Sequence, residues 1–247
     1  MSLPVAILAG GMATRLMPLT EKIPKALIDI NGEPFIVHQL RLLRSKGIVS
    51  VVICAGHLGE MIRDFVDDGR RFDIQVEYSF DGGRLLGTGG AIKKALTLLG
   101  ESFFVLYGDS YLPCDYKEME AVFEVSGKRG LMTVFRNEGA WDTSNVEFKN
   151  GQILAYDKRR LSPRMRHIDY GLGVFHKDAF DSVPKEMPYD LAELYRFLLG
   201  KGELAACEVD ERFYEIGSVE GLGELKRHMN WAKGEGLKAK GEGELDE

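Results

Sequence analysis

The chain has 247 residues, 45% of them apolar and 28% charged, so it is long and apolar enough for one large folded domain. Its formal net charge of -6 argues against a nucleic-acid partner, which an overall positive field would favour. No apolar run approaches the roughly 20 residues that cross a bilayer, and the three cysteines lack CxxC spacing. We therefore expect a cytoplasmic protein with no membrane partner.

The first part of the chain alternates short apolar runs with amphipathic stretches. Buried strands are predicted at residues 4–8, 49–54, 74–80 and 103–107. Helices are predicted at residues 34–47, 58–66, 91–99 and around 119–123. This alternation is typical of βαβ units, so we expect an α/β fold with a mostly parallel, Rossmann-like sheet between two layers of helices.

From Gly130 onward the pattern changes to closely spaced strands. They are predicted at residues 131–136, 144–149, 152–156 and 168–175. Asn150-Gly151 is the dipeptide of a tight two-residue hairpin. We expect an antiparallel, β-rich insertion over about residues 130–176, inside one domain of residues 1–232. A last helix is predicted from Ser218 to about Ala232, followed by a polar, disordered tail at 233–247.

A long segment without predicted secondary structure follows the first strand. Gly10-Gly11 would let backbone N–H groups approach phosphate oxygens, because no Cβ lies between them. Thr14 adds a hydroxyl, Arg15 a bidentate guanidinium and Lys25 a compact positive charge. Long loops of this kind usually have a function, and this composition predicts a phosphate-binding loop. It has neither the Walker A pattern nor the dinucleotide-binding glycine pattern.

One acidic residue directly follows the fourth buried strand. Gly108-Asp109-Ser110 puts Asp109 at the carboxyl end of a strand, where ligands of open parallel sheets bind. A carboxylate close to phosphates needs a cation between them, and Mg²⁺ takes one or two carboxylates plus phosphate oxygens. An aspartate after a strand can also cap a helix. Asp109 is therefore a candidate magnesium ligand.

Residues 8–34 resemble the signature loop of sugar-phosphate nucleotidyltransferases, GGxGTRLxPLTxxxPKxLxxIxGxP. The pattern is matched by Gly10, Gly11, Thr14, Arg15, Leu16, Pro18, Leu19, Thr20, Pro24, Lys25, Leu27, Ile30, Gly32 and Pro34. Ala13 stands where the third glycine usually lies, which adds a methyl group beside the phosphates. The resemblance extends to about residue 229 and implies a GT-A-like nucleotidyltransferase fold.

The resemblance also implies roles for individual residues. Nucleotide binding would fall to Leu8, Ala9, Gly10, Gly11, Thr14, Arg15, Lys25, Gly87, Thr88 and Gly89. Acceptor binding would fall to Asn145, Lys158, Tyr170 and Gly171. The catalytic residues would be Arg15, Lys25 and Asp109, and the magnesium ligands Asp109 and Glu215. Glu215 stands where the family usually has an aspartate. A helix beginning at Gly89 or Gly90 would direct its N-terminal dipole toward the nucleotide, although the glycines at 87–90 would equally allow close packing of a helix on the sheet.

The implied reaction is in-line attack of an acceptor phosphate oxygen on the α-phosphorus of a nucleoside triphosphate, with Mg²⁺ as cofactor. The expected acceptor is a sugar 1-phosphate, and pyrophosphate leaves. Arg15 would hold the departing β/γ oxygens, and Lys25 would meet charge that develops at the α-phosphorus or the acceptor phosphate. The five histidines show no metal spacing and no pairing with a Ser or Cys, so we expect direct displacement.

Three alternatives stay open. A cytidylyltransferase for a non-sugar phospho- or phosphono-acceptor would share the same loop. A nucleotide-sugar glycosyltransferase would call for an Asp-x-Asp pair where this chain has Asp109-Ser110-Tyr111. A non-catalytic subunit that senses a nucleotide sugar would be expected to lack Arg15, Lys25 or Asp109, and all three are present.

Overall fold

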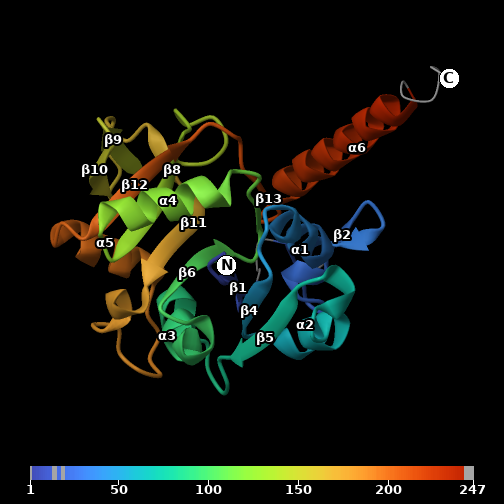
Figure 1. Cartoon of the computed structure of the whole chain (residues 1–247), viewed down its shortest axis with the longest axis horizontal. Helices are drawn as coiled ribbons and strands as arrows, with labels where there is room; N and C mark the ends of the chain where they lie inside the picture. The colour runs from blue at the N-terminus through green and yellow to red at the C-terminus, as the bar shows by residue number, and fades with distance from the viewer. Residues whose placement is uncertain (1, 13–15, 18–19, 242–247) are drawn as a thin grey trace.

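A nine-stranded sheet forms the centre of the protein (Figure 1), whose computed structural model describes residues 2–12, 16–17 and 20–241, with side chains as far as Trp231. The strands of this sheet are β1 (Val5–Ala9), β4 (Ser50–Ala55), β5 (Gln75–Phe80), β6 (Ser102–Tyr107), β8 (Gly130–Arg136), β9 (Val146–Lys149), β10 (Gln152–Tyr156), β11 (His167–His176) and β12 (Leu204–Val209). Two short pairs lie outside it: β2 (Asp29–Ile30) with β3 (Glu33–Pro34), and β7 (Ser110–Tyr111) with β13 (Tyr214–Glu215).

The sheet has a parallel part and an antiparallel part. Strands β6, β1, β4 and β5 are neighbours in that order, and all three pairings are parallel. Strand β11 joins β6 in the antiparallel sense and pairs on its other edge with β8. β9 and β10 form an antiparallel hairpin across Asn150 (φ 51°) and Gly151 (φ 76°), the positive φ pair that this turn requires. The predicted mixed sheet is confirmed.

Helices cover both faces of the sheet. They are α1 (Phe35–Ser45), α2 (Gly59–Val66), α3 (Gly87–Leu99), α4 (Tyr116–Ser126), α5 (Leu191–Gly200) and α6 (Val219–Gly241). Alternation along β1 divides the core: Val5 and Ile7 face the cluster that α1, α2 and α4 bury, whereas Ala6 faces the cluster that α3 and α5 bury. The three-layer arrangement is therefore the predicted one.

Three features of the second half differ from the sequence-based expectation. Helix α5, capped by the Asp190 side chain on the Ala192 N–H, and strand β12, parallel to β8, were not predicted. The prediction that the last helix ends near Ala232 is wrong, because α6 continues to Gly241. The helix continues through residues 233–241 although Gly234, Gly236 and Gly241 are poor helix formers, and we have no physical account of this continuation. Residues 242–247 lie outside the described part of the chain.

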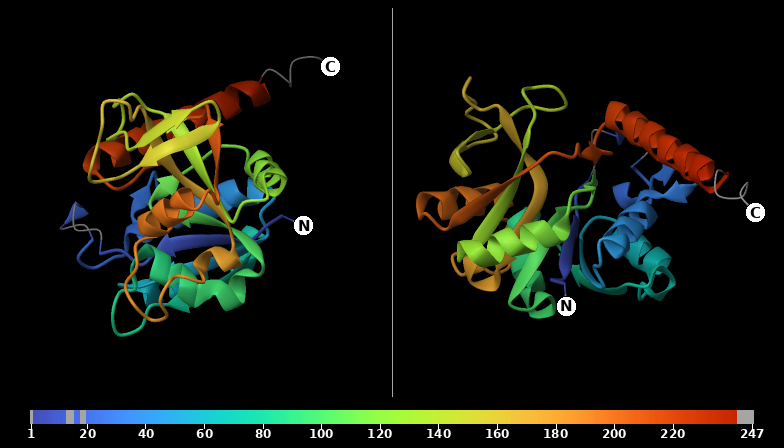
Figure 2. Two further views of the ribbon diagram at one scale, coloured as in Figure 1. Left: turned by 90° about the vertical axis from the view of Figure 1, so that its left-hand side faces the viewer. Right: turned by 45° about the horizontal axis from the view of Figure 1, so that its top comes forward.

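Helix α6 projects from the body of the molecule, as both views in Figure 2 show. Its first turns are anchored by a small apolar cluster, in which Leu225 and Met229 pack against Ile30, Phe35 and Ile216. This cluster ties the start of α6 to the segment that contains β13. The position of Glu215, in β13, is thereby coupled to the packing of the helix that follows it.

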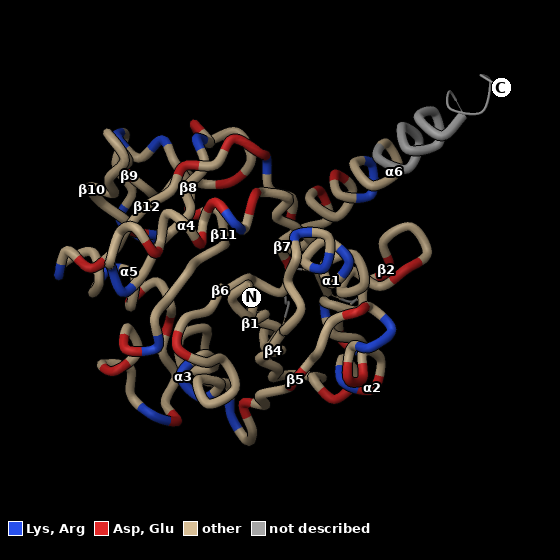
Figure 3. Tube along the Cα trace, viewed as in Figure 1, with Lys and Arg blue, Asp and Glu red and all other residues tan. Residues whose placement is uncertain are grey.

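Charged residues lie mainly on the helices and loops (Figure 3). The central strands β1, β4 and β6 contain no Lys, Arg, Asp or Glu, so these strands place no charged side chain in the middle of the sheet. Among the helices in the described ranges, none combines the length and the apolar character that a membrane span needs.

Candidate functional site

A pocket of about 250 Å³ lies at the carboxyl ends of β6, β1, β4 and β5, and we call it the strand-end pocket. It includes seven of the ten residues predicted to bind the nucleotide: Leu8, Ala9, Gly10, Gly11, Lys25, Gly87 and Thr88. Asp109 lies in the same lining, although it is 84 positions from Lys25 in the sequence. The predicted Thr14 and Arg15 lie outside the described residues. The sheet thus gathers the glycine loop, the second glycine segment and Asp109 around one cavity.

Close contact between neighbouring strand ends shapes the floor of this pocket. A Cβ at Gly108 would lie 2.6 Å from the main-chain oxygen of Leu8, which is nearer than any side chain can approach. The Gly108 N–H donates to that same oxygen at 2.9 Å. The glycine before Asp109 therefore lets the end of β6 lie directly against the end of β1.

The amino end of α3 is used differently from the sequence-based expectation. We expected α3 to begin at Gly89 or Gly90 and to direct its N-terminal dipole at the ligand; instead it begins at Gly87. The N–H groups of Gly89 and Gly90 donate to the Tyr189 main-chain oxygen at 2.8 and 3.2 Å, and Gly89 does not line the pocket. A Cβ at Gly87 (φ +68°) would lie 2.8 Å from the same oxygen. These glycines hold α3 against the segment before α5.

Lys25 and Asp109 form the charged end of the strand-end pocket. Lys25 Nζ donates to Asp109 Oδ2 at 2.9 Å, with side-chain exposures of 18% and 27%. Lys25 opens the short 3-10 helix η2 (Lys25–Leu27), directly after Pro24. Asp109 follows β6 and Gly108. Both predicted catalytic residues that fall in the described ranges therefore meet at one point, half-buried and in direct contact.

A second pocket, of about 380 Å³, lies between the antiparallel strands and the ends of β6 and β13, and we call it the insertion pocket. It brings together all four residues predicted to bind the acceptor: Asn145, Lys158, Tyr170 and Gly171. Asp109 and Glu215 also line it. Because Asp109 and Tyr107 line both pockets, the two cavities adjoin at the end of β6.

Backbone pairing brings Glu215 beside Asp109. In the β7–β13 ladder Glu215 lies opposite Ser110, and the Ile216 N–H donates to the Asp109 main-chain oxygen at 2.9 Å. The Glu215 Oε1 accepts from the Ser218 hydroxyl at 3.5 Å, a long contact at the start of α6. Two carboxylates from distant parts of the chain thus share one wall of the insertion pocket.

The Asp109 and Glu215 carboxylates would suit Mg²⁺, which needs few protein ligands, better than a metal ion that is coordinated wholly by side chains. Within the described ranges there is no group of three or more His, Cys, Asp or Glu side chains that would hold an ion. Mg²⁺ is commonly bound by one or two carboxylates, with substrate phosphates and water completing its octahedron. Asp109, which lines both pockets, and Glu215, which lines the insertion pocket, fit that pattern.

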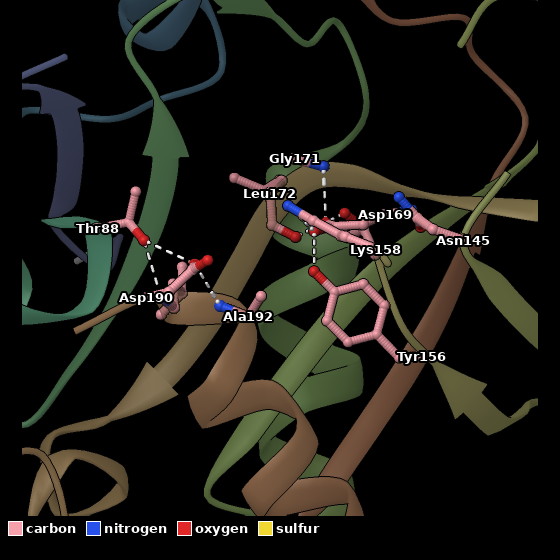
Figure 4. Close-up of polar contacts among 11 residues, drawn as sticks. Thr88, Asn145, Tyr156, Lys158, Asp169, Gly171, Leu172, Asp190 and Ala192 are labelled. Carbon is pink, nitrogen blue, oxygen red and sulfur yellow. Dashed lines mark hydrogen bonds and ion pairs between the residues drawn. The ribbon is translucent and has the colours of Figure 1, made fainter. Parts of the chain in front are cut away.

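A buried carboxylate that the sequence-based list of site residues did not contain organises the insertion pocket (Figure 4). The Asp169 side chain is only 3% exposed, and its Oδ2 accepts from the Tyr156 hydroxyl at 3.0 Å and lies 3.5 Å from Lys158 Nζ. Its Oδ1 accepts from the Gly171 N–H at 3.2 Å, inside the irregular part of β11. Asp169 therefore fixes Lys158 and the backbone at Gly171 together.

Lys158 is held as a cation. Burial opposes its charge, but Asp169 and then Tyr107 outweigh that effect, so the pKa of Lys158 is raised above its ordinary value. Its Nζ also lies 5.4 Å from the centre of the Tyr107 ring, at the boundary of the two pockets. A cation that remains partly exposed, at 41%, and cannot lose its proton near neutral pH suits an anionic ligand.

The polar groups of Asn145 and Thr88 already form hydrogen bonds within the protein. Asn145 Oδ1 accepts from the Asp169 N–H at 3.0 Å, and its Nδ2 makes no hydrogen bond to the described residues. The Thr88 hydroxyl donates to Asp190 at 3.2 Å and accepts from the Leu191 N–H at 2.8 Å (Figure 4). Asn145 therefore offers a donor to the insertion pocket, whereas Thr88 links α3 to the start of α5.

Comparison of the sequence with known proteins identifies nucleotidyltransferases in each case. Residues 5–148 match a family model described as nucleotidyl transferase. The chain is 29% identical over 235 residues to UTP–glucose-1-phosphate uridylyltransferase of Synechocystis sp., an alignment that covers 86% of this chain and 60% of that protein. It is 28% identical over 217 residues to D-glycero-alpha-D-manno-heptose 1-phosphate guanylyltransferase of Campylobacter jejuni, covering 87% of this chain and 94% of that protein.

Solved structures share the fold. A putative glucose-1-phosphate thymidylyltransferase from Bacillus anthracis superposes with a TM-score of 0.81 at 18% identity, over 92% of this chain and 94% of that one. HddC from Yersinia pseudotuberculosis superposes with a TM-score of 0.77 at 22% identity, over 92% of this chain and 99% of that one. At these identities the superposition establishes the arrangement of helices and strands.

Proposed function

Because the chain belongs to the nucleotidyl transferase family, we propose that it transfers a nucleoside monophosphate from a nucleoside triphosphate to a sugar 1-phosphate and releases pyrophosphate. The observation that carries this proposal is that the strand-end and insertion pockets meet at Asp109 and Tyr107. Transfer between two bound substrates needs two adjoining sites that hold the reacting atoms together. The curated relatives act on sugar 1-phosphates by name, which supports that acceptor class.

The nucleoside triphosphate would occupy the strand-end pocket. Its phosphates would lie at the end where Lys25 meets Asp109, because a cation and a metal-binding carboxylate are both needed there. Arg15 would hold the β/γ oxygens that leave, as the signature loop implies. The Lys25 ammonium, already beside Asp109, would then be shared between that carboxylate and a phosphate oxygen.

The sugar 1-phosphate would occupy the insertion pocket. Lys158 supplies the fixed positive charge for the acceptor phosphate, with Asp169 holding the ammonium in place. The Asn145 Nδ2 supplies a donor for a sugar hydroxyl. Tyr170 and Gly171, in the irregular part of β11, would support the sugar ring from below.

Mg²⁺ would be held by Asp109, which lines both pockets, and by Glu215, which lines the insertion pocket. When bound there, the ion would neutralise negative charge between the α-phosphate and the acceptor phosphate. The residues of the chain would act by position and charge alone: Lys25 and Lys158 would bring two anions together and keep them aligned.

Direct displacement is favoured over a covalent intermediate. Cys54 lines the strand-end pocket, and burial, together with Asp81, raises the pKa of its thiol to about 12. A thiol with that pKa is protonated near neutral pH and is a poor nucleophile. All three cysteines are buried free thiols, which also supports our proposal of a cytoplasmic location.

The test is to incubate the chain with each of four nucleoside triphosphates and a panel of sugar 1-phosphates, and to follow pyrophosphate release. We expect release that requires both substrates and Mg²⁺, with an NDP-sugar as second product. Phosphocholine and phosphonate acceptors, and labelled nucleotide sugars as donors, test the cytidylyltransferase and glycosyltransferase alternatives. Nucleotide-sugar binding without any turnover would favour a sensing subunit and contradict the proposal.

A further inference from the structure

The short segment that leads into β13 presents its side chains alternately to two sides. Phe213 and Glu215 line the insertion pocket. The Arg212 guanidinium instead lies over the Tyr214 ring, 4.9 Å from its centre, so these two side chains share the opposite side. An extended chain imposes this period of two. The contacts that fix Arg212 and Tyr214 therefore also fix the direction in which Glu215 enters the pocket.

Helix α6 contacts both of these side chains. The His228 ring stacks on the Tyr214 ring, with ring centres 4.1 Å apart and planes 18° from parallel. Arg212 Nη2 forms an ion pair with Glu224, and both side chains are about three-quarters buried. The buried Arg212 Nε makes no hydrogen bond within the described residues. Ring contacts and one ion pair, rather than a complete set of hydrogen bonds, therefore hold this guanidinium.

The closest ring to Arg212 comes from the other side of the insertion pocket. The guanidinium carbon lies 3.4 Å from the centre of the Trp141 ring, which is direct stacking contact. Trp141 belongs to the loop between β8 and β9, and it is 48% exposed. The next two residues, Asp142 and Thr143, line the insertion pocket. Arg212 thus joins the segment that carries Glu215 to the loop that borders the acceptor pocket.

A buried amide fixes this loop around Trp141. Asn137 is 2% exposed, and its Oδ1 accepts from the Trp141 N–H at 3.2 Å. Its Nδ2 donates to the main-chain oxygen of Asp142. Since one side chain holds the backbone at both residues, Trp141 and the pocket-lining Asp142 are positioned together. The Trp141 ring is therefore a fixed surface for the guanidinium.

We propose that Arg212 is a positioning residue that, stacked on Trp141, sets both the place of Glu215 as a metal ligand and the place of the loop against the acceptor. This inference rests on the proposed function for the metal ion and the acceptor. Arginine suits the role because its guanidinium is planar, always charged and stacks on aromatic faces. Lysine keeps the charge but lacks the plane, so it does not replace arginine in such a stack.

Binding of Mn²⁺ alone to the full chain, followed by the electron paramagnetic resonance signal of the free ion, tests this inference. Trp141→Leu and Arg212→Lys both leave the net charge unchanged. Each should weaken Mn²⁺ binding about 10-fold, as expected when a group that orients a metal ligand is lost. Trp141→Phe keeps a flat ring and should restore most of the affinity. Trp231→Leu, at the exposed second tryptophan, is the matched control and should bind Mn²⁺ like the unmodified chain.

Two further readouts separate positioning from a merely structural role. The effects of Trp141→Leu and Arg212→Lys on Mn²⁺ affinity should be non-additive in a double-mutant cycle, because the two side chains are in contact. Both variants should raise the KM for the sugar 1-phosphate and leave the Kd of the nucleoside triphosphate at saturating Mg²⁺ unchanged. Additive effects, or reduced stability with unchanged Mn²⁺ affinity and KM, would overturn the inference.

The Mn²⁺ measurements need no substrate, so they separate this inference from the proposed function. If Mn²⁺ binding responds as expected but no sugar 1-phosphate yields pyrophosphate, the proposed reaction is wrong and the positioning role stands. If pyrophosphate is released and Glu215→Gln weakens Mn²⁺ binding but Trp141→Leu does not, the reaction stands and the positioning role is wrong. Unchanged Mn²⁺ binding in Glu215→Gln overturns the positioning role together with the metal assignment. Should Arg212→Lys fail to fold, the comparison of Trp141→Leu with Trp141→Phe still decides.

Discussion

Lys25 Nζ lies 2.9 Å from Asp109 Oδ2, which joins the loop after the first strand to the end of β6. A cation and a carboxylate in such contact partly neutralise one another, which allows both to sit half-buried before any substrate binds. In the proposed reaction the pair marks the point where phosphates from both pockets meet. The following predictions test the residues around that point.

Removing the charge of Asp109 should affect the rate far more than substrate binding. Asp109→Asn keeps the shape of the side chain but removes a metal ligand, so turnover should fall by about two to three orders of magnitude. Activity of the unmodified chain should disappear in excess EDTA and return with Mg²⁺. Steady-state assays of pyrophosphate release measure both effects, and activity that survives EDTA would contradict the magnesium assignment.

Removing the charge of Lys25 should slow the reaction without unfolding the chain. Lys25→Met keeps the apolar stem, and we expect at least a 10²-fold loss of turnover with a change in the free energy of unfolding of about 1 kcal/mol or less. Lys22→Met, on the same loop but exposed, is the matched control and should behave like the unmodified chain. Denaturant titration alongside the assay separates the two effects; early unfolding or full turnover of Lys25→Met counts against a catalytic role.

Lys158 should act on the acceptor alone. Lys158→Ala removes the cation from the insertion pocket, so the KM for sugar 1-phosphate should rise, kcat should fall, or both. The Kd of the nucleoside triphosphate should not change. Arg160→Ala removes a nearby exposed charge outside the pocket and is the control. A changed nucleotide Kd in Lys158→Ala would show that the two pockets have been assigned in the wrong order.

Asp169 should act through Lys158 as a positioning residue. Asp169→Asn weakens the anchor of the ammonium while keeping an acceptor for the Gly171 N–H. We expect a higher KM for the acceptor, and a double-mutant cycle with Lys158→Ala should be non-additive because the two side chains are in contact. Additive effects of the two substitutions on KM would indicate that Asp169 only stabilises β11.

Glu215 should determine how much Mg²⁺ the reaction requires. Glu215→Gln keeps the shape and removes the charge, so the Mg²⁺ concentration for half-maximal rate should rise. Glu215→Asp should lose activity, because Mg²⁺ requires ligand distances near 2.0–2.1 Å and the shorter side chain reaches less far. Mn²⁺, whose coordination is less strict, should partly rescue Glu215→Asp. An unchanged Mg²⁺ dependence in Glu215→Gln would make Glu215 a structural residue.

Local patterns in the sequence were sufficient for the parallel half of the sheet and for one hairpin. Alternating buried runs and helical stretches predicted the parallel half, and Asn150-Gly151 predicted the β9–β10 hairpin, because both depend on near neighbours in the chain. Strand β12 escaped prediction because its sequence, LAACEV over Leu204–Val209, shows little alternation of apolar and polar residues. The end of α6 was misjudged because the apolar residues on which the prediction relied become sparse near Ala232, whereas the helix continues to Gly241.

Residues of the candidate site were predictable where they directly follow a strand and their type has one obvious chemical role there. Asp109 and the glycine loop were found in this way, and the same rule applied to β5 would have pointed to Asp81. Asp169 was missed as a site residue because its partners, Tyr156 and Lys158, reach it only through tertiary pairing of the hairpin strands. Gly89 was assigned to the nucleotide because its contact with Tyr189 likewise depends on a distant segment.

Exchange of radiolabelled pyrophosphate into the nucleoside triphosphate tests the central claim most directly. In direct displacement, labelled pyrophosphate can form the triphosphate only by attacking the NDP-sugar in the reverse reaction. The NDP-sugar must first form from the nucleotide and the sugar 1-phosphate, so exchange requires the sugar 1-phosphate. We predict label in the triphosphate when enzyme, Mg²⁺, nucleotide and sugar 1-phosphate are all present, and none when the sugar 1-phosphate is omitted. Label that enters the triphosphate without sugar 1-phosphate, or never enters it, would contradict the account.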